Sequence, residues 1–204
     1  MLTRRQWLTF VPLAGLTGLA CPSRALASST LVTTPNNAIG AIVAAIGLDL
    51  LDIQIDPNLA DDQITIAGGV PVVISQRILR KGEGTASSRF LDDARNATKI
   101  GGNIKTALSD ALPDLAADFD LNHHAWAKPF ASHAVAWTKQ LAKLGLGKVR
   151  DDHGRVYLLE WAGATIDPEA KPSPAGLARA PEQPSSPTLA AYQDYIGDLI
   201  AALS

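Results

Sequence analysis

The chain has 204 residues, of which 47% are hydrophobic, and its formal net charge at pH 7 is −2. This composition is typical of a globular protein. Because Lys and Arg are not in excess over Asp and Glu, we expect no nucleic-acid partner, which would need a basic surface to neutralise its phosphates. Beyond the first 27 residues, no segment has about twenty uninterrupted apolar residues, so we expect a soluble chain that is not an integral membrane protein.

The first 27 residues are typical of a cleaved export signal. A charged start is followed by an apolar run from Trp7 to Ala20 and by small residues that end at Ala27. The pair Arg4-Arg5 fits the twin-arginine pattern, and an ordinary Sec signal with two arginines is the alternative. Cleavage after Ala27 predicts a periplasmic protein.

Cys21 is the only cysteine. A lipoprotein would be acylated on it after cleavage between Ala20 and Cys21, but the preceding "GLA" is a poor match to a lipobox. Cleavage after Ala27 leaves a mature chain without cysteine, which excludes a disulfide framework and a zinc–thiolate site.

The segment after the signal predicts the start of an α/β domain. "STLVTT" is typical of a strand, and "PNNAIGAIVAAIG" is typical of a helix that Asn36 or Asn37 caps and Gly47 ends. "LDLLDIQIDPN" alternates in its second half and stops at Pro57, which predicts a strand that enters a loop. Two short β-branched runs follow, "QITIAGG" and "VPVVIS", and they predict further strands.

A polar loop leads into a helix within "RFLDDARNATKIGGNIKTALSDALPD", which Asp92 or Asp93 can cap. The pair Gly101-Gly102 lowers the helix propensity by about 1 kcal/mol per glycine, so either the packing is close there or the helix is weakened. The predicted apolar face consists of Ala97, Ile100, Ile104 and Leu108.

A longer helix is predicted from Asp114 onward, where the periodic signal is the strongest in the chain. Pro129 lies within this pattern and should kink the helix or split it in two. Gly145 and Gly147 end the pattern. The apolar stripe consists of Leu115, Phe119, Trp126, Phe130, Trp137, Leu141 and Leu144.

Three segments complete the chain. Periodicity leaves "VYLLEW" open as a strand or a helix. The proline-rich segment at 168–187 predicts a linker or a long surface loop. "TLAAYQDYIGDLIAAL" predicts an amphipathic C-terminal helix with an apolar face of Leu189, Tyr192, Ile196, Leu199, Ile200 and Leu203.

Several of these segments occur in the order found in the zinc and manganese substrate-binding proteins, the metal-binding periplasmic components of ABC transporters. "TTPNNAIGAIVAAIG" resembles their opening strand and first helix, and "FLDDARNATKIGGNIKTAL" resembles their "WLDP" segment and the start of the long helix that joins two lobes. "RDDHGRVYLLEWAGATIDPEAKPSPAGL" is similar to the second-lobe stretch in which a histidine precedes an aromatic-rich helix and a Glu-Pro-Lys-Pro segment. "YQDYIGDLIAAL" resembles the terminal helix.

The resemblance implies an α/β fold in which small sheet-plus-helix lobes are joined by a long backbone helix, as a reduced version of a two-lobed metal-binding protein. It divides the chain into an export signal at 1–27, an N-terminal α/β lobe at 28–90, a helical backbone at 91–145 and a reduced C-terminal lobe at 146–204, which holds the proline-rich loop and the terminal helix. The chain is shorter than a full member of this family.

The resemblance carries over only part of the metal site. Asn58 stands in an Asp-Pro-Asn turn where the family has Asp-Pro-His, and Ser88 stands where the family's second histidine precedes its Trp-Leu-Asp element. The third histidine corresponds to His153, and Asp167 stands where the family has the glutamate of its Glu-Pro segment. A zinc or manganese site needs three or four converging nitrogen or carboxylate ligands, so His153 would need helpers.

The candidate helpers are a nearby carboxylate, from Asp151, Asp152 or Asp167, or one of His123 and His124 in the long helix. The two helix histidines are adjacent, so about 100° separates them around the axis, and they lack the i, i+4 spacing that aims two rings at one metal. The alternatives are an exposed histidine in an Asp-Asp-His-Gly turn for His153, and capped or partly buried helix histidines for His123 and His124.

Two functional hypotheses follow. The first is periplasmic capture of a divalent zinc or manganese ion for delivery to an ABC transporter permease in the inner membrane, with no chemical step. The second, motivated by Asn58 and Ser88, is a relative that has lost the site and acts as a metal-free binding or scaffold protein for a protein partner or an organic solute. We do not expect an enzyme, because the sequence has no Gly-x-Ser-x-Gly, His-Glu-x-x-His or phosphate-binding glycine motif.

Overall fold

The computed structural model describes residues 29–76, 78 and 89–204. It shows a mixed α/β fold with small sheets and a large helical part. The export signal predicted at 1–27 and the position of Ser88 lie outside the described residues. Within them, no helix combines the length and the apolar character that crossing a membrane requires.

The first sheet has four strands in the order β2-β1-β3-β4. The central strand β1 runs parallel to β2 and antiparallel to β3, and β3 pairs with β4 in antiparallel fashion. All four predicted strands are confirmed, with bounds β1 Thr30–Thr34, β2 Leu51–Ile55, β3 Gln63–Ile66 and β4 Val72–Val73.

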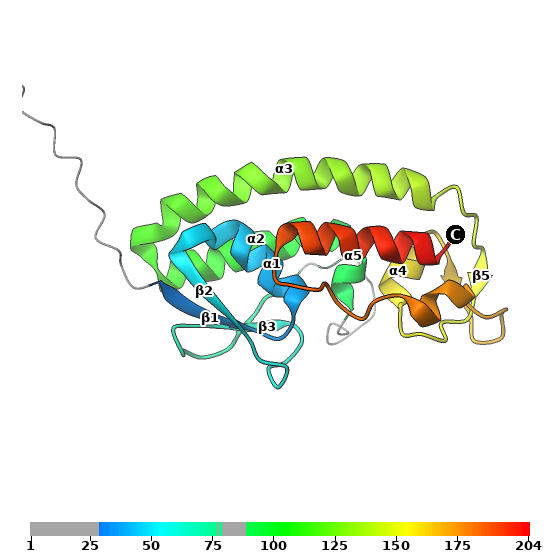
Figure 1. The fold of residues 1–204 in the computed structure, drawn as a ribbon, viewed down its shortest axis with the longest axis horizontal. Coiled ribbons are helices and arrows are strands. Elements are labelled where there is room, and N and C mark those ends of the chain that lie inside the picture. The colour runs from blue at the N-terminus through cyan, green and yellow to red at the C-terminus, as the bar shows by residue number, and fades with distance from the viewer. Residues whose placement is uncertain (1–28, 77, 79–88) are drawn as a thin grey trace, which may run out of the picture.

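Helix α1, Asn37–Gly47, lies between this sheet and the other long helices (Figure 1). Its sequence is apolar on nearly every side, which is typical of a helix at the centre of a fold. The Asn36 side chain accepts a hydrogen bond from the backbone N–H of Ile39 at 3.0 Å, so the predicted cap is confirmed at Asn36.

Helix α2, Arg95–Ala111, buries the predicted apolar face. The N-cap position is Ala94 and no side chain caps the helix, so the predicted cap at Asp92 or Asp93 is wrong. The Asp92 carboxylate is bonded to distant residues. The Asp93 carboxylate accepts the backbone N–H of Arg95 at 3.0 Å. A Cβ on Gly101 would lie 2.5 Å from Cζ2 of Trp126, so close packing explains this glycine.

Helix α3, Ala116–Leu141, is one continuous helix with Pro129 inside it, so the predicted split does not occur. Pro129 removes one backbone N–H, which leaves the carbonyl of Ala125 without its helical donor. Both residues are exposed, so water can satisfy that carbonyl. The predicted apolar stripe is confirmed, with Phe119, Trp126, Phe130 and Leu141 buried.

In the C-terminal quarter, the segment "VYLLEW" forms the short helix α4, Val156–Trp161. Periodicity left this segment open as a strand or a helix, and the family resemblance implied a helix. It lies beside a second sheet of two parallel strands, β5 Lys148–Val149 and β6 Thr165–Ile166. The remaining short elements are 3-10 turns at Leu48–Leu50, Phe90–Asp92, Pro113–Leu115 and Ala175–Arg179.

The predicted C-terminal helix is confirmed as α5, Leu189–Ala202, and the side chain of Thr188 caps its N-terminus. It packs along α1 and lies beneath α3 (Figure 1). The ring of Tyr192 stacks on that of Phe130 in α3, with 5.7 Å between centroids. The buried side chains of all these helices form one core cluster.

Candidate functional site

His153 and Asp167 are the two candidate metal ligands that the family resemblance suggests. Both belong to the segments around β5, α4 and β6, at one end of the molecule (Figure 1). The half-buried His153 follows Asp151, whose carboxylate accepts the His153 backbone N–H at 3.2 Å. The carboxylate of Asp167 accepts the backbone N–H of Glu169 at 3.0 Å and the ammonium of Lys148 at 3.2 Å. These two partners lower the pKa of Asp167, and both belong to its own loop and sheet.

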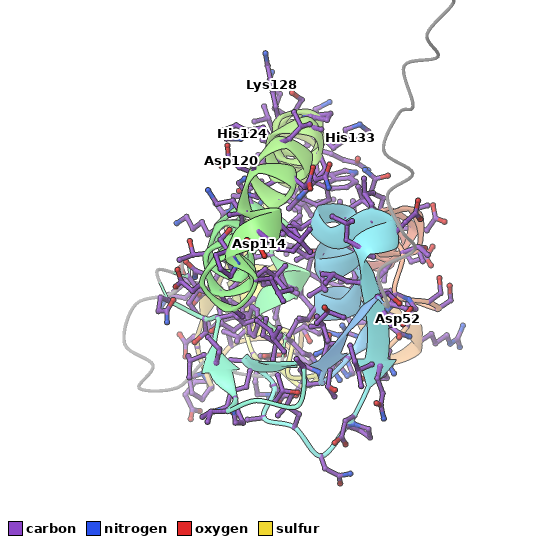
Figure 2. The ribbon with its side chains drawn as sticks, turned by 90° about the vertical axis from the view of Figure 1, so that its left-hand side faces the viewer. Asp52, Asp114, Asp120, His124, Lys128 and His133 are labelled. Atoms are coloured by element: carbon purple, nitrogen blue, oxygen red, sulfur yellow. The ribbon has the colours of Figure 1, made fainter. Side chains whose placement is uncertain are left out.

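His123 and His124 lie in the first half of α3. Figure 2 shows His124 on the outer surface of the helix beside Asp120, and its Nδ1 donates to the backbone carbonyl of Asp120 at 2.8 Å. His123 turns inward, where its ring meets that of Trp126 edge to face at 5.8 Å. Burial lowers the pKa of His123, and the nearby Lys105 ammonium acts in the same direction.

The four predicted ligands do not come together. From His123 to the end of α3 at Leu141 the helix axis runs about 27 Å, at about 1.5 Å per residue, and His153 and Asp167 lie beyond that end. In the described part of the chain, no group of three or more His, Cys, Asp or Glu side chains is placed to hold a metal ion. Asn58 donates its backbone N–H to the Asp56 carboxylate at 2.9 Å and so stabilises its own turn.

A different polar cluster lies in the core. Arg155, Asp92 and Tyr195 are only 1%, 2% and 4% exposed. Nη1 of Arg155 donates to the Asp92 carboxylate at 2.9 Å and to the Tyr195 hydroxyl at 2.8 Å. The Tyr195 hydroxyl in turn donates to the other Asp92 oxygen at 2.5 Å. We call these three residues the buried triad.

Burial raises the pKa of Asp92, and the charge and hydrogen bonds of Arg155 and Tyr195 oppose that effect. Burial and the adjacent Asp92 also raise the pKa of Tyr195, so this hydroxyl stays protonated and acts as a donor. The triad was not predicted from the sequence. The available signals were an arginine directly before the apolar "VYLLEW" and a second tyrosine, Tyr195, on the apolar side of the terminal helix.

The triad holds the segment 181–184, which belongs to the proline-rich stretch, against the start of α1. Nη2 of Arg155 donates to the carbonyl of Pro181 at 2.5 Å. From the other side, Nδ2 of Asn37 donates to the carbonyl of Pro184 at 2.8 Å. The proline-rich stretch is therefore a surface loop that is fixed to the core, and the alternative of a free linker is wrong.

This arrangement borders a half-open pocket of about 210 Å³. Its walls come from four parts of the chain: the start of α1, Asp61 in the turn before β3, the segment 89–92 and the segment 182–184, with Tyr195 of α5 behind them. We call it the α1 pocket. Its lining residues are Asn36, Ala38, Asp61, Arg89, Phe90, Leu91, Asp92, Glu182, Gln183, Pro184 and Tyr195.

The charged groups of the α1 pocket differ in how they are paired. Arg89 forms an ion pair with Glu182 through Nη2, while its Nη1 is buried and makes no hydrogen bond with any described residue. Asp92 is paired within the triad, and Asp61 is exposed and has no ion pair within the described ranges. The α1 pocket therefore combines an arginine whose buried Nη1 has no acceptor among the described residues with an exposed carboxylate, that of Asp61.

Comparison with models of known protein families and with curated protein sequences finds no match for this chain. The functional interpretation of the α1 pocket therefore depends on its own geometry.

Proposed function

We propose that this protein is an exported solute-binding protein that captures a small polar organic molecule in the α1 pocket. This is the metal-free alternative of the two sequence hypotheses. The observation that carries it is a pocket of about 210 Å³ whose walls come from distant parts of the chain and are held in place by the buried triad. Such prior ordering of the walls reduces the entropy that a ligand would otherwise lose on binding.

Binding without a chemical step fits the residues of this pocket. None of the described lining residues is a Ser, Cys or His, so the pocket brings no nucleophile and imidazole base together. Its polar groups are an arginine, carboxylates and amides, which are groups that recognise and orient a solute.

The experiment is a thermal-unfolding screen of the protein against a panel of small polar metabolites. A ligand at about 100 times its Kd stabilises the folded state by about 2.7 kcal/mol, which moves the melting temperature by several degrees. Gln183 is exposed and lines the pocket, so Gln183→Trp should fill it and remove the shift. Gln54→Trp, an exposed position on β2 outside the pocket, is the matched control and should retain it. A panel without any hit, or a shift that survives Gln183→Trp, contradicts the proposal.

Export and delivery complete this proposal. The charged start and the apolar run within residues 1–27 support passage to the periplasm. The order of segments that resembles the metal-binding components of ABC transporters supports delivery of the solute to a permease in the inner membrane. Replacing Arg4 and Arg5 with lysine should retain the precursor in the cytoplasm if the signal is of the twin-arginine type. Undiminished export of that variant would indicate the Sec alternative.

Capture of zinc or manganese is the second proposal, and one observation favours it. The segment after His153 forms helix α4, as the resemblance to metal-binding transport components implies. A zinc and manganese titration by calorimetry, with wild type and His153→Ala, tests it. One equivalent bound with submicromolar affinity and lost in the variant supports metal capture. Absent or unaltered binding contradicts it.

A further inference from the structure

The first clue to the ligand is the unused side of the Arg89 guanidinium. Arg89 lines the pocket, and its Nη2 is ion-paired with Glu182, whereas its Nη1 is buried and has no acceptor in the described part of the chain. A buried donor without an acceptor is unfavourable, because the group has lost its water and gained nothing. A ligand oxygen at this position would remove that cost.

A second donor lies in the same pocket, at the start of α1. The backbone N–H of Ile39 is taken by Asn36 and that of Asn37 by the Gln183 side chain at 3.4 Å. The N–H of Ala38, which also lines the pocket, has no acceptor among the described residues. The first turn of a helix favours negative charge, so Arg89 and Ala38 together suit a carboxylate.

A carboxylate alone would nevertheless meet an unfavourable field. Among the described residues, the lining contains three acidic side chains, those of Asp61, Asp92 and Glu182, and one arginine, Arg89. Asp92 and Glu182 have cationic partners of their own, whereas Asp61 has none in the described part of the structure. Asp61 therefore favours a ligand that also carries a positive group.

We propose that the ligand is a small zwitterionic amino acid, with its carboxylate at Arg89 and the Ala38 N–H and its ammonium group at Asp61. This inference rests on the proposed solute-binding function and names its ligand class. The volume of about 210 Å³ corresponds to about seven water molecules, so it fits amino acids with short side chains. Because Asp61 is exposed and solvated, the carboxylate end contributes more to affinity than the ammonium end.

The experiment is calorimetric titration of the intact protein with glycine, L-alanine, L-serine and L-aspartate. Propionate and ethylamine serve as matched probes. Propionate is L-alanine without its ammonium group, and ethylamine is L-alanine without its carboxylate. We expect at least one of the amino acids to bind. If L-alanine is that ligand, it should bind at least about tenfold more tightly than ethylamine, which lacks the carboxylate that Arg89 holds. It should bind about threefold more tightly than propionate, which lacks only the ammonium group at the exposed Asp61.

The variants separate the two ends of the ligand. Arg89→Met should weaken amino-acid binding about tenfold or more, and Arg89→Lys should recover only part of it, because lysine lacks the planar fork. Asp61→Asn should weaken binding by about threefold, as for an exposed charge pair. Arg150→Met and Asp194→Asn, exposed positions outside the pocket, are the matched controls and should bind as wild type does.

The outcomes distinguish the ligand class from the function itself. Binding of propionate as tight as that of L-alanine, or unchanged amino-acid binding in Arg89→Met, would overturn the zwitterion assignment. A ligand of another class whose binding Gln183→Trp abolishes would also overturn it while the solute-binding function stands. If neither the amino acids nor the wider metabolite panel binds, both inferences fail together.

Discussion

Replacing Arg155 with methionine tests whether the buried triad holds the fold and the pocket wall together. Arg155 is almost fully buried and donates to Asp92, to Tyr195 and to the carbonyl of Pro181. Methionine fills a similar volume but donates no hydrogen bond. The Asp92 carboxylate would keep only the hydrogen bond from Tyr195 and would lose its counter-charge.

Removal of one partner from a buried ion pair typically costs about 3–5 kcal/mol. We expect a value near the lower end, about 3 kcal/mol, because the pKa of Asp92 is already raised by burial and the carboxyl can take up a proton. The folded pKa then lies above the unfolded value near 3.9. As the pH rises past that value the unfolded chain loses its proton first, so the destabilisation grows with pH until the folded carboxyl is also ionised.

The assay is urea unfolding followed by tryptophan fluorescence, at pH 4 and at pH 7. With an m value of about 2 kcal/mol/M, the midpoint of Arg155→Met should fall by about 1.5 M at pH 7 and by less at pH 4. Combining it with Asp92→Asn should recover part of the loss, because no buried charge remains unpaired. Arg150→Met breaks an exposed ion pair with Asp152 and serves as the matched control, with little change expected. A midpoint for Arg155→Met equal to that of this control would refute the reasoning.

Two further predictions concern the contact between α2 and α3. Gly101→Ala should destabilise the protein by about 1–3 kcal/mol, because its Cβ would lie 2.5 Å from Trp126. Gly102→Ala should stabilise it by about 0.5–1 kcal/mol, because a Cβ at Gly102 meets open space. If chemical denaturation showed that both variants change the free energy of unfolding in the same direction, the packing argument would be contradicted. Because burial lowers the pKa of His123, the unfolded chain takes up the proton first as the pH falls below about 6.5, and the free energy of unfolding should decrease from there to the folded pKa. His123→Gln should remove this part of the pH dependence and the control His124→Gln should not, and a wild-type profile retained in His123→Gln would refute the assignment.

Local signals in the sequence were sufficient for most of the secondary structure. Helical spacing of apolar residues predicted α1, α2, α3 and α5, and short β-branched runs predicted the four strands of the first sheet. The cap at Asn36 was also predictable, because the hydrogen bond that it makes spans only three residues. In each case the interacting groups are close in sequence, so their pattern is visible without knowledge of the fold.

Some features were decided by the environment of a residue. Pro129 does not split α3, since the carbonyl that it leaves without a donor is exposed, and exposure is a tertiary property. The glycine at 101 reflects close packing against Trp126 from another helix. The sequence showed that both positions were unusual, but it did not show how the fold would accommodate them.

The sequence by itself therefore determined the four long helices, the strands of the first sheet and their order, because local periodicity and capping depend on near neighbours. Only the tertiary structure decided the α1 pocket, because its groups are distant along the chain. Asp92 meets Arg155 across 63 positions and Tyr195 across 103, and no pattern of near neighbours encodes such pairings. Burial then gives these contacts their energetic weight, since a charge removed from water must find its partner within the fold.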